Sequence, residues 1–356
     1  MKNKREANFE LLRIVSMFMI TVLHYMNHGG MLTPWHEGQS AMNAVNGAAW
    51  LIEAFCLCGM SCFILLSGYF LVPEKWKLSR VVSLILQCLF YSLAVPVIAM
   101  LTGAVNPADI DVYDVLDWFF PIATESWWFM TSYISMYILS PLLSYGAEKM
   151  GRHRLGALII FLIFFESVEK TILPVILPTD GYGYDAMWMI TMFLTARYIR
   201  LYGIGFLEKP FRPAICYTIC CLGMYFISLI TGRAAALGVD GLKYYSGMPY
   251  TCNYFLCMSG SIALFYMFKK LVMREGYPAD FARAVSPLVL GAYLIHEHPV
   301  IREIWPGWLF ADSVRGTFLF IPGTFAAVTV VMAVGCICEL LRSRLFSLAQ
   351  RPRRAA

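Results

Sequence analysis

The chain of 356 residues is 59% hydrophobic and only 14% charged, with a mean hydropathy of +0.63. About a quarter of the residues of a soluble domain are charged, so this composition excludes an ordinary water-soluble protein and indicates a membrane protein. The net charge of +5 does not indicate a nucleic-acid partner, because the basic residues lie between apolar runs and no stretch combines a basic surface with stacking aromatics.

Apolar runs long enough to cross a bilayer, about 20 residues each, recur along the whole chain. The ten runs cover residues 8–28, 48–71, 81–103, 127–147, 155–177, 185–202, 213–232, 250–269, 285–303 and 317–341. We therefore predict an all-α, polytopic protein of the cell membrane with about ten transmembrane helices. A single integral-membrane domain is expected over residues 1–345, followed by a basic cytoplasmic tail at 346–356. The sixth run is the least typical, because it is short and contains Arg197.

Lysine and arginine are distributed unevenly between alternate loops. If the N-terminus is cytoplasmic, the even-numbered loops and the tail are cytoplasmic too, and they contain Lys75, Lys77, Arg80, Lys149, Arg152, Arg154, Arg200, Lys209, Arg212, Lys269, Lys270, Arg274, Arg283, Arg342, Arg344, Arg351, Arg353 and Arg354. The opposite loops contain little beyond Lys170, Arg233, Lys243, Arg302 and Arg315. Because loops rich in positive charge stay in the cytoplasm, we predict that both termini are cytoplasmic.

The first run contains a cation and an imidazole, Arg13 and His24, with only apolar residues, one Ser and one Thr between them. Eleven helical residues rotate through about 1100°, roughly 20° past three turns, and rise about 16 Å. The two side chains therefore share one helix face, and Glu10 falls on the same stripe. A cation inside the membrane is costly unless it is paired or faces water, so this face predicts a polar path through the protein.

Other ionisable side chains collect in the outer half of the predicted bundle. They are His24, His28, Glu53, Glu125, Glu166, Glu169, Lys170, Asp185, His296, Glu297, His298, Arg302 and Glu303. Such groups inside spans are functional candidates by default. A structural ion pair or an interfacial anchor is the preferred interpretation for four of them, Glu169, Lys170, Arg302 and Glu303. The eleven cysteines lie almost entirely within apolar runs and lack metal-ligand spacing, so we interpret them as packing residues and expect no metal.

The inner half combines a small-residue segment with a basic pair. Ser67 lies near the end of the second run, and Lys77 and Arg80 lie three residues apart at the start of the third. Residues three apart are neighbours on one helix face, and two cations beside a helix N-terminus suit a phosphate group. The alternative is that they are ordinary cytoplasmic positive charge.

Four segments together resemble the type 3 membrane acyltransferases, over nearly the whole chain. They are Asn8–Arg13 with His24, where Glu10 replaces the more usual Asp; Cys62–Phe70 with Lys77-x-x-Arg80, similar to an Arg-x-x-Arg element; Trp127–Phe129 with Tyr133 and Pro141; and Gly291–Glu297. The resemblance implies transfer of an acyl group, usually acetyl, from cytoplasmic acyl-CoA to a hydroxyl of an outer cell-envelope or exported polysaccharide, or of a glycolipid. No bound cofactor is implied, since acyl-CoA is the donor substrate.

The same resemblance suggests a role for each residue type. His24 is the candidate general base, or else the transient acyl carrier. Glu10 is expected to orient Arg13, which would stabilise the thioester oxyanion or steer the CoA phosphates. The expected donor-binding residues are Lys77, Arg80 and Ser67. The expected acceptor-binding residues are Trp127, Trp128, Tyr133, Glu166, His296 and Glu297. Two alternatives stay open, namely that the aromatic residues form an interfacial belt and that His296 and Glu297 set the tautomer of His24.

Two other functions remain compatible with the pattern. One is a transporter or permease-like module, although we expect no appended soluble enzyme for it to serve. The other is a polymerase or flippase component of polysaccharide export, a class that usually has a large outer loop. No gap between the predicted spans is that long.

Overall fold

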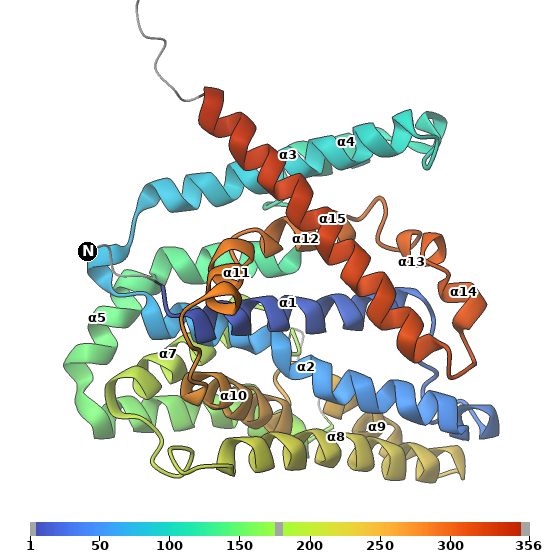
Figure 1. The fold of residues 1–356 in the computed structure, drawn as a ribbon. Helices are drawn as coiled ribbons and strands as arrows, with labels where there is room; N and C mark the ends of the chain where they lie inside the picture. Colours follow the sequence, from blue (N-terminus) through green and yellow to red (C-terminus); the bar gives the residue numbers. More distant parts are fainter. Residues whose placement is uncertain (1–4, 175–180, 350–356) are drawn as a thin grey trace, which may run out of the picture.

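The computed structural model describes residues 5–174 and 181–349, and within these ranges the chain folds into helices without a strand. The long helices, shown in Figure 1, are α1 (Ala7–His28), α2 (Ala44–Phe70), α3 (Leu78–Leu101), α5 (Trp128–Ile163), α7 (Ala186–Tyr202), α8 (Arg212–Ala236), α10 (Phe255–Lys270) and α15 (Phe320–Ala349). The short ones are α4 (Val112–Phe119), α6 (Glu169–Ile172), α9 (Lys243–Gly247), α11 (Tyr277–Val285), α12 (Val289–His296), α13 (Trp305–Trp308) and α14 (Ala311–Val314). The predicted all-α class is confirmed.

Six helical stretches of the described chain are long and apolar enough to cross a membrane. They cover Ala7–His28, Ala44–Phe70, Leu78–Leu101, Arg212–Ala236, Asp240–Lys270 and Phe320–Leu348. Their outward side chains are apolar, for example Ile98 on α3, Ile219 on α8 and Ile337 on α15. A soluble protein would cover such helices with charge, so the protein is a multi-pass membrane protein. These stretches correspond, within a few residues at most of their ends, to the first, second, third, seventh, eighth and tenth predicted spans.

The other predicted spans are shorter or interrupted. The fourth, 127–147, corresponds to the first part of α5, which changes direction at Gly151, where φ is 72° and ψ is 168° (Figure 1). Only glycine adopts such a conformation without steric cost. The fifth, 155–177, begins in α5 after this turn and continues through a π-helical turn (Phe164–Val168) and α6, and its last residues, 175–177, lie outside the described part of the chain. The predicted ninth span, 285–303, is not one helix, because α12 ends at His296 shortly before Pro299. Proline restricts the residue before it and cannot continue the hydrogen-bond ladder. The break leaves Glu297 and His298 on irregular backbone beside α1.

Helix α1 lies among α2, α10, α11, α12 and α15. Its side chains are buried on several faces, and Leu12, Val22 and Met26 are fully enclosed. Small residues let the neighbouring helices approach closely, as is common in membranes. A Cβ at Gly68 of α2 would lie 2.5 Å from the carbonyl oxygen of Phe193. A Cβ at Gly335 of α15 would lie 2.3 Å from the Cα of Ala292 on α12.

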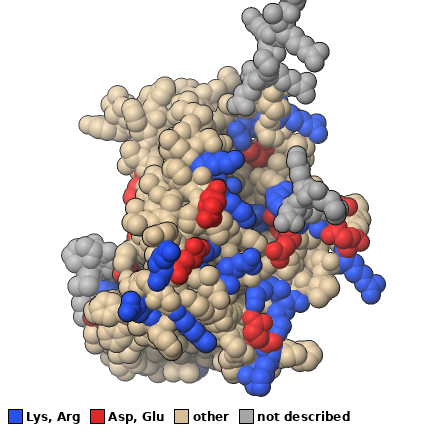
Figure 2. All heavy atoms as spheres, turned by 90° about the vertical axis from the view of Figure 1, so that its left-hand side faces the viewer, with Lys and Arg blue, Asp and Glu red and all other residues tan. Residues whose placement is uncertain are grey.

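The basic side chains gather at one end of the bundle. Helices α1 and α3 begin at this end and α2 and α10 finish there, on the left of Figure 1. Figure 2 views the same end and shows Lys and Arg with Asp and Glu among them. Ion pairs join them, including Arg283 to Glu275 at 2.6 Å and Lys269 to Glu208 at 2.5 Å. We call this end the basic face. Its charge agrees with the predicted cytoplasmic loops, and the orientation in the membrane stays a prediction.

Candidate active site

A cavity of about 510 Å³ lies toward the end of the bundle opposite the basic face. The C-terminal half of α1, the N-terminal half of α2, the start of α5 and the end of α12 form its walls. Its polar and aromatic lining includes His24, His28, Glu53, Glu297, Trp50, Trp128, Tyr184 and Tyr250. This size and mixture of apolar walls with a few polar groups are typical of small-molecule sites. We call it the histidine cavity.

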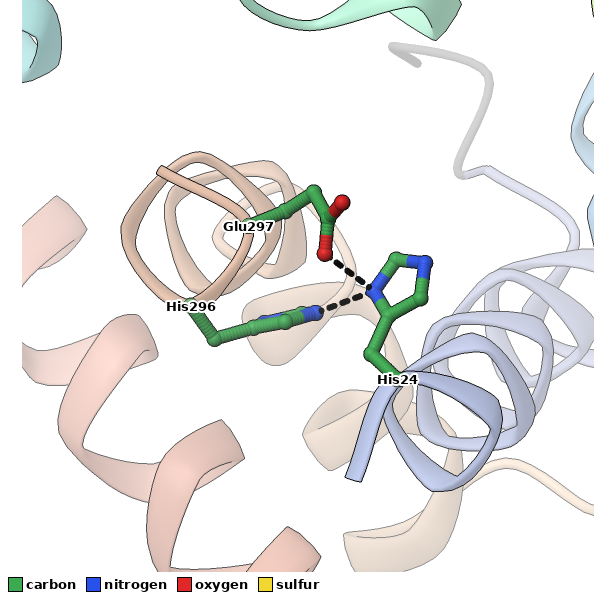
Figure 3. Close-up of side chains that lie close together, drawn as sticks. All are labelled: His24, His296 and Glu297. Carbon is green, nitrogen blue, oxygen red and sulfur yellow. Dashed lines mark hydrogen bonds and ion pairs between the residues drawn. The ribbon is translucent and has the colours of Figure 1, made fainter. Parts of the chain in front are cut away.

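His24 of α1 meets the end of α12 in this cavity (Figure 3). Its Nδ1 atom lies 3.0 Å from Nε2 of His296 and 3.0 Å from Oε2 of Glu297. His296 and Glu297 are almost fully buried, whereas about a fifth of the His24 side chain is exposed. The two histidines come from positions 272 residues apart. The short α12 and its early end therefore bring two of the predicted acceptor-side residues against the predicted base.

The hydrogen bonds assign the ring protons. Nδ1 of His296 lies 2.7 Å from the carbonyl oxygen of Ala292, which only accepts, so this nitrogen donates. In the neutral ring Nε2 of His296 is then an acceptor, as is the carboxylate of Glu297. Nδ1 of His24 must therefore carry the proton that both of them share. Its Nε2 is left with a free lone pair and has no hydrogen-bond partner in the described chain. In Figure 3 this atom points away from both neighbours.

A second histidine fixes the carboxylate from its other side. His28 lies one turn after His24, and its Nε2 is 3.3 Å from Oε2 of Glu297 while its Nδ1 is 3.0 Å from Glu303. Arg302 lies 4.0 Å from Glu297. Glu297 is thus surrounded by positive or proton-donating groups, which favours its ionised form and holds its position. The spacing of four residues, which places His24 and His28 on one face of α1, is the sequence signal that could have paired these two histidines.

His24, His296 and Glu297 also offer three atoms within 4.8 Å of one another, a spacing that a metal ion can use. Two ligands about 2.0 Å from a tetrahedral zinc are about 3.3 Å apart. The two 3.0 Å contacts of His24 are shorter than that and have the length of hydrogen bonds. A hydrogen-bonded triad accounts for both contacts.

Other predicted site residues lie around the cavity or beyond it. Trp128 lines it and packs edge-to-face on Tyr184, with ring centroids 4.7 Å apart. Trp127 is buried outside the cavity lining, and its ring centroid lies 5.3 Å from that of His298. Among the described residues, Trp127, Tyr133 and Glu166 do not line the histidine cavity. The backbone oxygen of Glu166 accepts a hydrogen bond from Asn253 at 2.8 Å.

A row of aromatic rings runs along α5 from the cavity toward the basic face. Phe129 lines the cavity, and its ring stacks on Tyr133 at 5.9 Å, which in turn stacks on Tyr137 at 6.4 Å. The guanidinium of Arg80 lies 5.9 Å from the Tyr137 ring. Tyr133 also shares a hydrogen bond of 3.0 Å with Ser67. This row therefore connects Ser67 and Arg80, which were predicted to bind the donor, with Tyr133, which was predicted to bind the acceptor.

Arg13 lies apart from His24. Its Nη1 donates to Oε2 of Glu10 at 2.9 Å, so the expected pairing of these two residues is present. The same carboxylate also accepts from Arg5 at 3.1 Å and from the hydroxyl of Ser286. The histidine cavity reaches Met17 but does not include Arg13 among the described residues that line it. The histidine cavity therefore covers the His24 part of the polar path expected from the sequence and ends short of Arg13.

The family model for an acyltransferase domain, acyltransferase family 3, matches residues 6–339. The chain belongs to this family. The acyltransferase is an enzyme that transfers groups other than aminoacyl groups, which favours the enzyme over the transporter and the export component. Searches of curated proteins and of solved structures found no match.

Two residues of the acyltransferase received no role from the sequence. His28 and Glu53 were recognised only as members of the ionisable cluster, yet both line the histidine cavity. Glu53 faces it from α2, whose sequence around this residue is otherwise apolar or aromatic. The signal that could have selected it is a lone carboxyl within a span, which is costly to place there without a function.

Proposed function

We propose that this acyltransferase transfers an acyl group, acetyl in the first instance, from cytoplasmic acyl-CoA to a hydroxyl of an extracytoplasmic polysaccharide or glycolipid of the cell envelope. The observation that supports it best is the free Nε2 of His24, a residue that lines the histidine cavity and whose Nδ1 is held by Glu297 and His296. A hydroxyl is a poor nucleophile until a base removes its proton during attack.

The proposed reaction is a direct transfer. Nε2 of His24 takes the proton of the acceptor hydroxyl as its oxygen attacks the thioester carbonyl carbon. The carbon–sulfur bond then breaks, and the leaving CoA sulfur receives that proton from His24. The products are the acyl ester and CoA with a free thiol. Glu297 stabilises the imidazolium that forms in between, as a carboxylate does beside a catalytic histidine. In the covalent alternative, Nε2 attacks the thioester carbonyl carbon and CoA leaves as its thiolate. The acceptor hydroxyl then attacks the acyl-imidazolium carbon, His24 leaves as a neutral imidazole, and the hydroxyl proton passes to the CoA sulfur.

We propose that acyl-CoA, the donor substrate, binds with its phosphates at the basic face. Lys77 and Arg80 are exposed at the start of α3, where their charges are available to the phosphates of CoA. From Arg80 the row of rings on α5 leads past Tyr137, Tyr133 and Phe129 to the cavity. The helix rises about 12 Å over the eight steps from Phe129 to Tyr137. The flexible arm of CoA, between its phosphates and its thioester, would bridge this distance.

The position of Arg13 narrows its proposed role. It lies about 16 Å from His24 along α1, at the end of the helix that forms the basic face, and it is paired with Glu10. An oxyanion donor must lie about 3 Å from the reacting oxygen. We therefore propose that Arg13 steers the CoA phosphates and does not stabilise the oxyanion.

Radiolabelled acetyl-CoA supplied to membranes that contain envelope polysaccharide tests this function. His24→Ala is expected to lower label transfer by at least about 100-fold, the usual contribution of a general base. His153→Ala is the control, because His153 is exposed on the α5 bend away from the cavity. Transfer by His24→Ala at the wild-type rate, with the protein present in equal amount, would overturn the proposal.

A further inference from the structure

Glu53 is a cavity-lining carboxyl that the proposed mechanism does not use. It lies on α2, on the wall of the histidine cavity formed with Trp50 and Leu57. Its Oε2 atom is buried and has no hydrogen-bond partner in the described chain. The other charged groups of the cavity contact one another, since Glu297 contacts His24 and His28. Among the described residues that line the cavity, Glu53 has a carboxyl oxygen without a partner, and the Tyr293 hydroxyl and Nε2 of His24 also lack one.

Aromatic rings surround this part of the cavity and are fixed in place. Trp50 and Tyr250 lie with their ring centroids 4.5 Å apart, and the Tyr250 hydroxyl donates to the backbone oxygen of Trp50 at 2.9 Å. Trp50 donates in turn to the backbone oxygen of Thr33 at 2.9 Å. Trp128 and Tyr184 form a second pair at 4.7 Å. All four rings line the cavity, so a ligand would meet two preformed aromatic surfaces beside one carboxyl.

A buried carboxyl without a partner costs free energy that a ligand can recover. The cost is at least about 1–3 kcal/mol for an unsatisfied polar group, and it is far larger for an isolated ionised carboxylate. A neutral carboxyl, in contrast, both donates and accepts a hydrogen bond. Two adjacent hydroxyl groups on one ring offer the matching donor and acceptor, while the ring's apolar faces match the aromatic walls.

We propose that Glu53 binds hydroxyl groups of the acceptor's sugar ring next to the hydroxyl that is acylated, and that it thereby determines acceptor specificity. This inference rests on the proposed function and assigns the acceptor subsite within it. Glu53 on α2 and His24 on α1 line the same cavity, so the ring lies between a recognising carboxyl and a reacting imidazole. Glu53 is a specificity residue and takes no proton from the reacting hydroxyl.

The first test is a kinetic comparison of Glu53→Leu, Glu53→Gln and wild type, with acetyl-CoA and a panel of methyl glucopyranoside, methyl galactopyranoside, N-acetylglucosamine and glucosamine. Glu53→Leu is expected to raise KM for the neutral sugars at least tenfold, while kcat and KM for acetyl-CoA stay within about twofold. KM of Glu53→Gln for these sugars is expected to lie between the values of wild type and Glu53→Leu, because an amide also donates and accepts hydrogen bonds. Glu37→Leu, on the exposed loop after α1, is the matched control and is expected to match wild type.

Two results would overturn the proposal. One is an unchanged KM for every sugar in Glu53→Leu. The other is a response confined to glucosamine, with Glu53→Gln as impaired as Glu53→Leu, which would mean that the carboxylate binds an ammonium group. Melting temperatures of the purified variants check that each is folded.

A binding measurement separates this proposal from the proposed function. Trp50 and Trp128 line the cavity, so sugars that enter it are expected to change the tryptophan fluorescence of the purified protein without acetyl-CoA. If wild type fails to transfer acetyl but its fluorescence responds to sugars and Glu53→Leu does not, the acyl transfer proposal fails and the subsite remains. If wild type and Glu53→Leu respond alike, or neither responds, the subsite proposal is wrong.

Discussion

Replacing Glu297 by Gln tests the hydrogen-bonded triad at its centre. The carboxylate lies 3.0 Å from Nδ1 of His24 and 3.3 Å from Nε2 of His28. Two unit charges 3.0 Å apart interact by about 5 kcal/mol at an effective dielectric constant near 20. This is an upper limit on the stabilisation of the imidazolium that forms on His24, because its charge is spread over the ring.

The substitution is therefore expected to remove about 3–5 kcal/mol of transition-state stabilisation. Each 1.36 kcal/mol changes the rate tenfold, so kcat is expected to fall by about 10²–10⁴. The amide of Gln also offers a donor to Nδ1, which would move the proton of His24 to Nε2 and remove the base. Neither effect acts on the substrates directly, so KM for acyl-CoA and for the acceptor is expected to stay within about twofold.

Glu303→Gln is the matched control. Glu303 contacts His28 at 3.0 Å and not His24, and its side chain is mostly exposed. We expect it to lower kcat by less than about tenfold, because exposed ion pairs contribute little. Steady-state assays with purified enzyme and acetyl-CoA supply both constants. If folded Glu297→Gln keeps kcat within threefold of wild type, or if Glu303→Gln is equally impaired, the assigned role of Glu297 is wrong.

Three further predictions address the donor side and the packing. The double substitution of Lys77 and Arg80 by Ala is expected to raise KM for acetyl-CoA at least tenfold, and an unchanged KM would remove both from the donor site. Tyr133→Phe deletes a hydrogen bond to Ser67 of α2, worth about 0.5–1.5 kcal/mol, and is expected to raise KM for acetyl-CoA two- to tenfold. A change confined to KM for the acceptor would contradict the proposal that acyl-CoA lies along the row of rings on α5. Gly335→Ala overpacks α15 against α12 and is expected to destabilise the protein by about 1–3 kcal/mol and to lower its activity. Gly146 has open space around it, so Gly146→Ala is the control and is expected to do neither; equal melting temperatures of the two variants would refute the predicted overpacking.

The sequence predicted features that depend on one helix at a time. Arg13 and His24 were assigned to one face of the first span from helical periodicity, and the Glu10–Arg13 contact at 2.9 Å agrees with that spacing. Composition and apolar runs were sufficient for the all-α membrane class. These features are local, so residue spacing determines them.

Features that depend on contacts between distant segments could not be predicted in the same way. The 3.0 Å contact of His24 with His296 spans 272 residues, and periodicity within α1 contains no information about α12. The end of α12 at His296 divides the predicted ninth span, 285–303, which looks continuous in hydropathy, whereas the turn at Gly151 lies in the predicted loop between the fourth and fifth spans. The extension of the cavity to Met17 and not to Arg13 depends on the side chains of all surrounding helices.

Chemical rescue of His24→Ala by imidazole measures the central claim most directly, because it asks whether an imidazole in the histidine cavity removes the proton. Acetyl transfer by His24→Ala is expected to be at least about 100-fold slower than wild type. Added imidazole is expected to restore it at least tenfold in a saturable manner, without stimulating wild type. Transfer by His24→Ala at the wild-type rate, with no response to imidazole, would contradict the account.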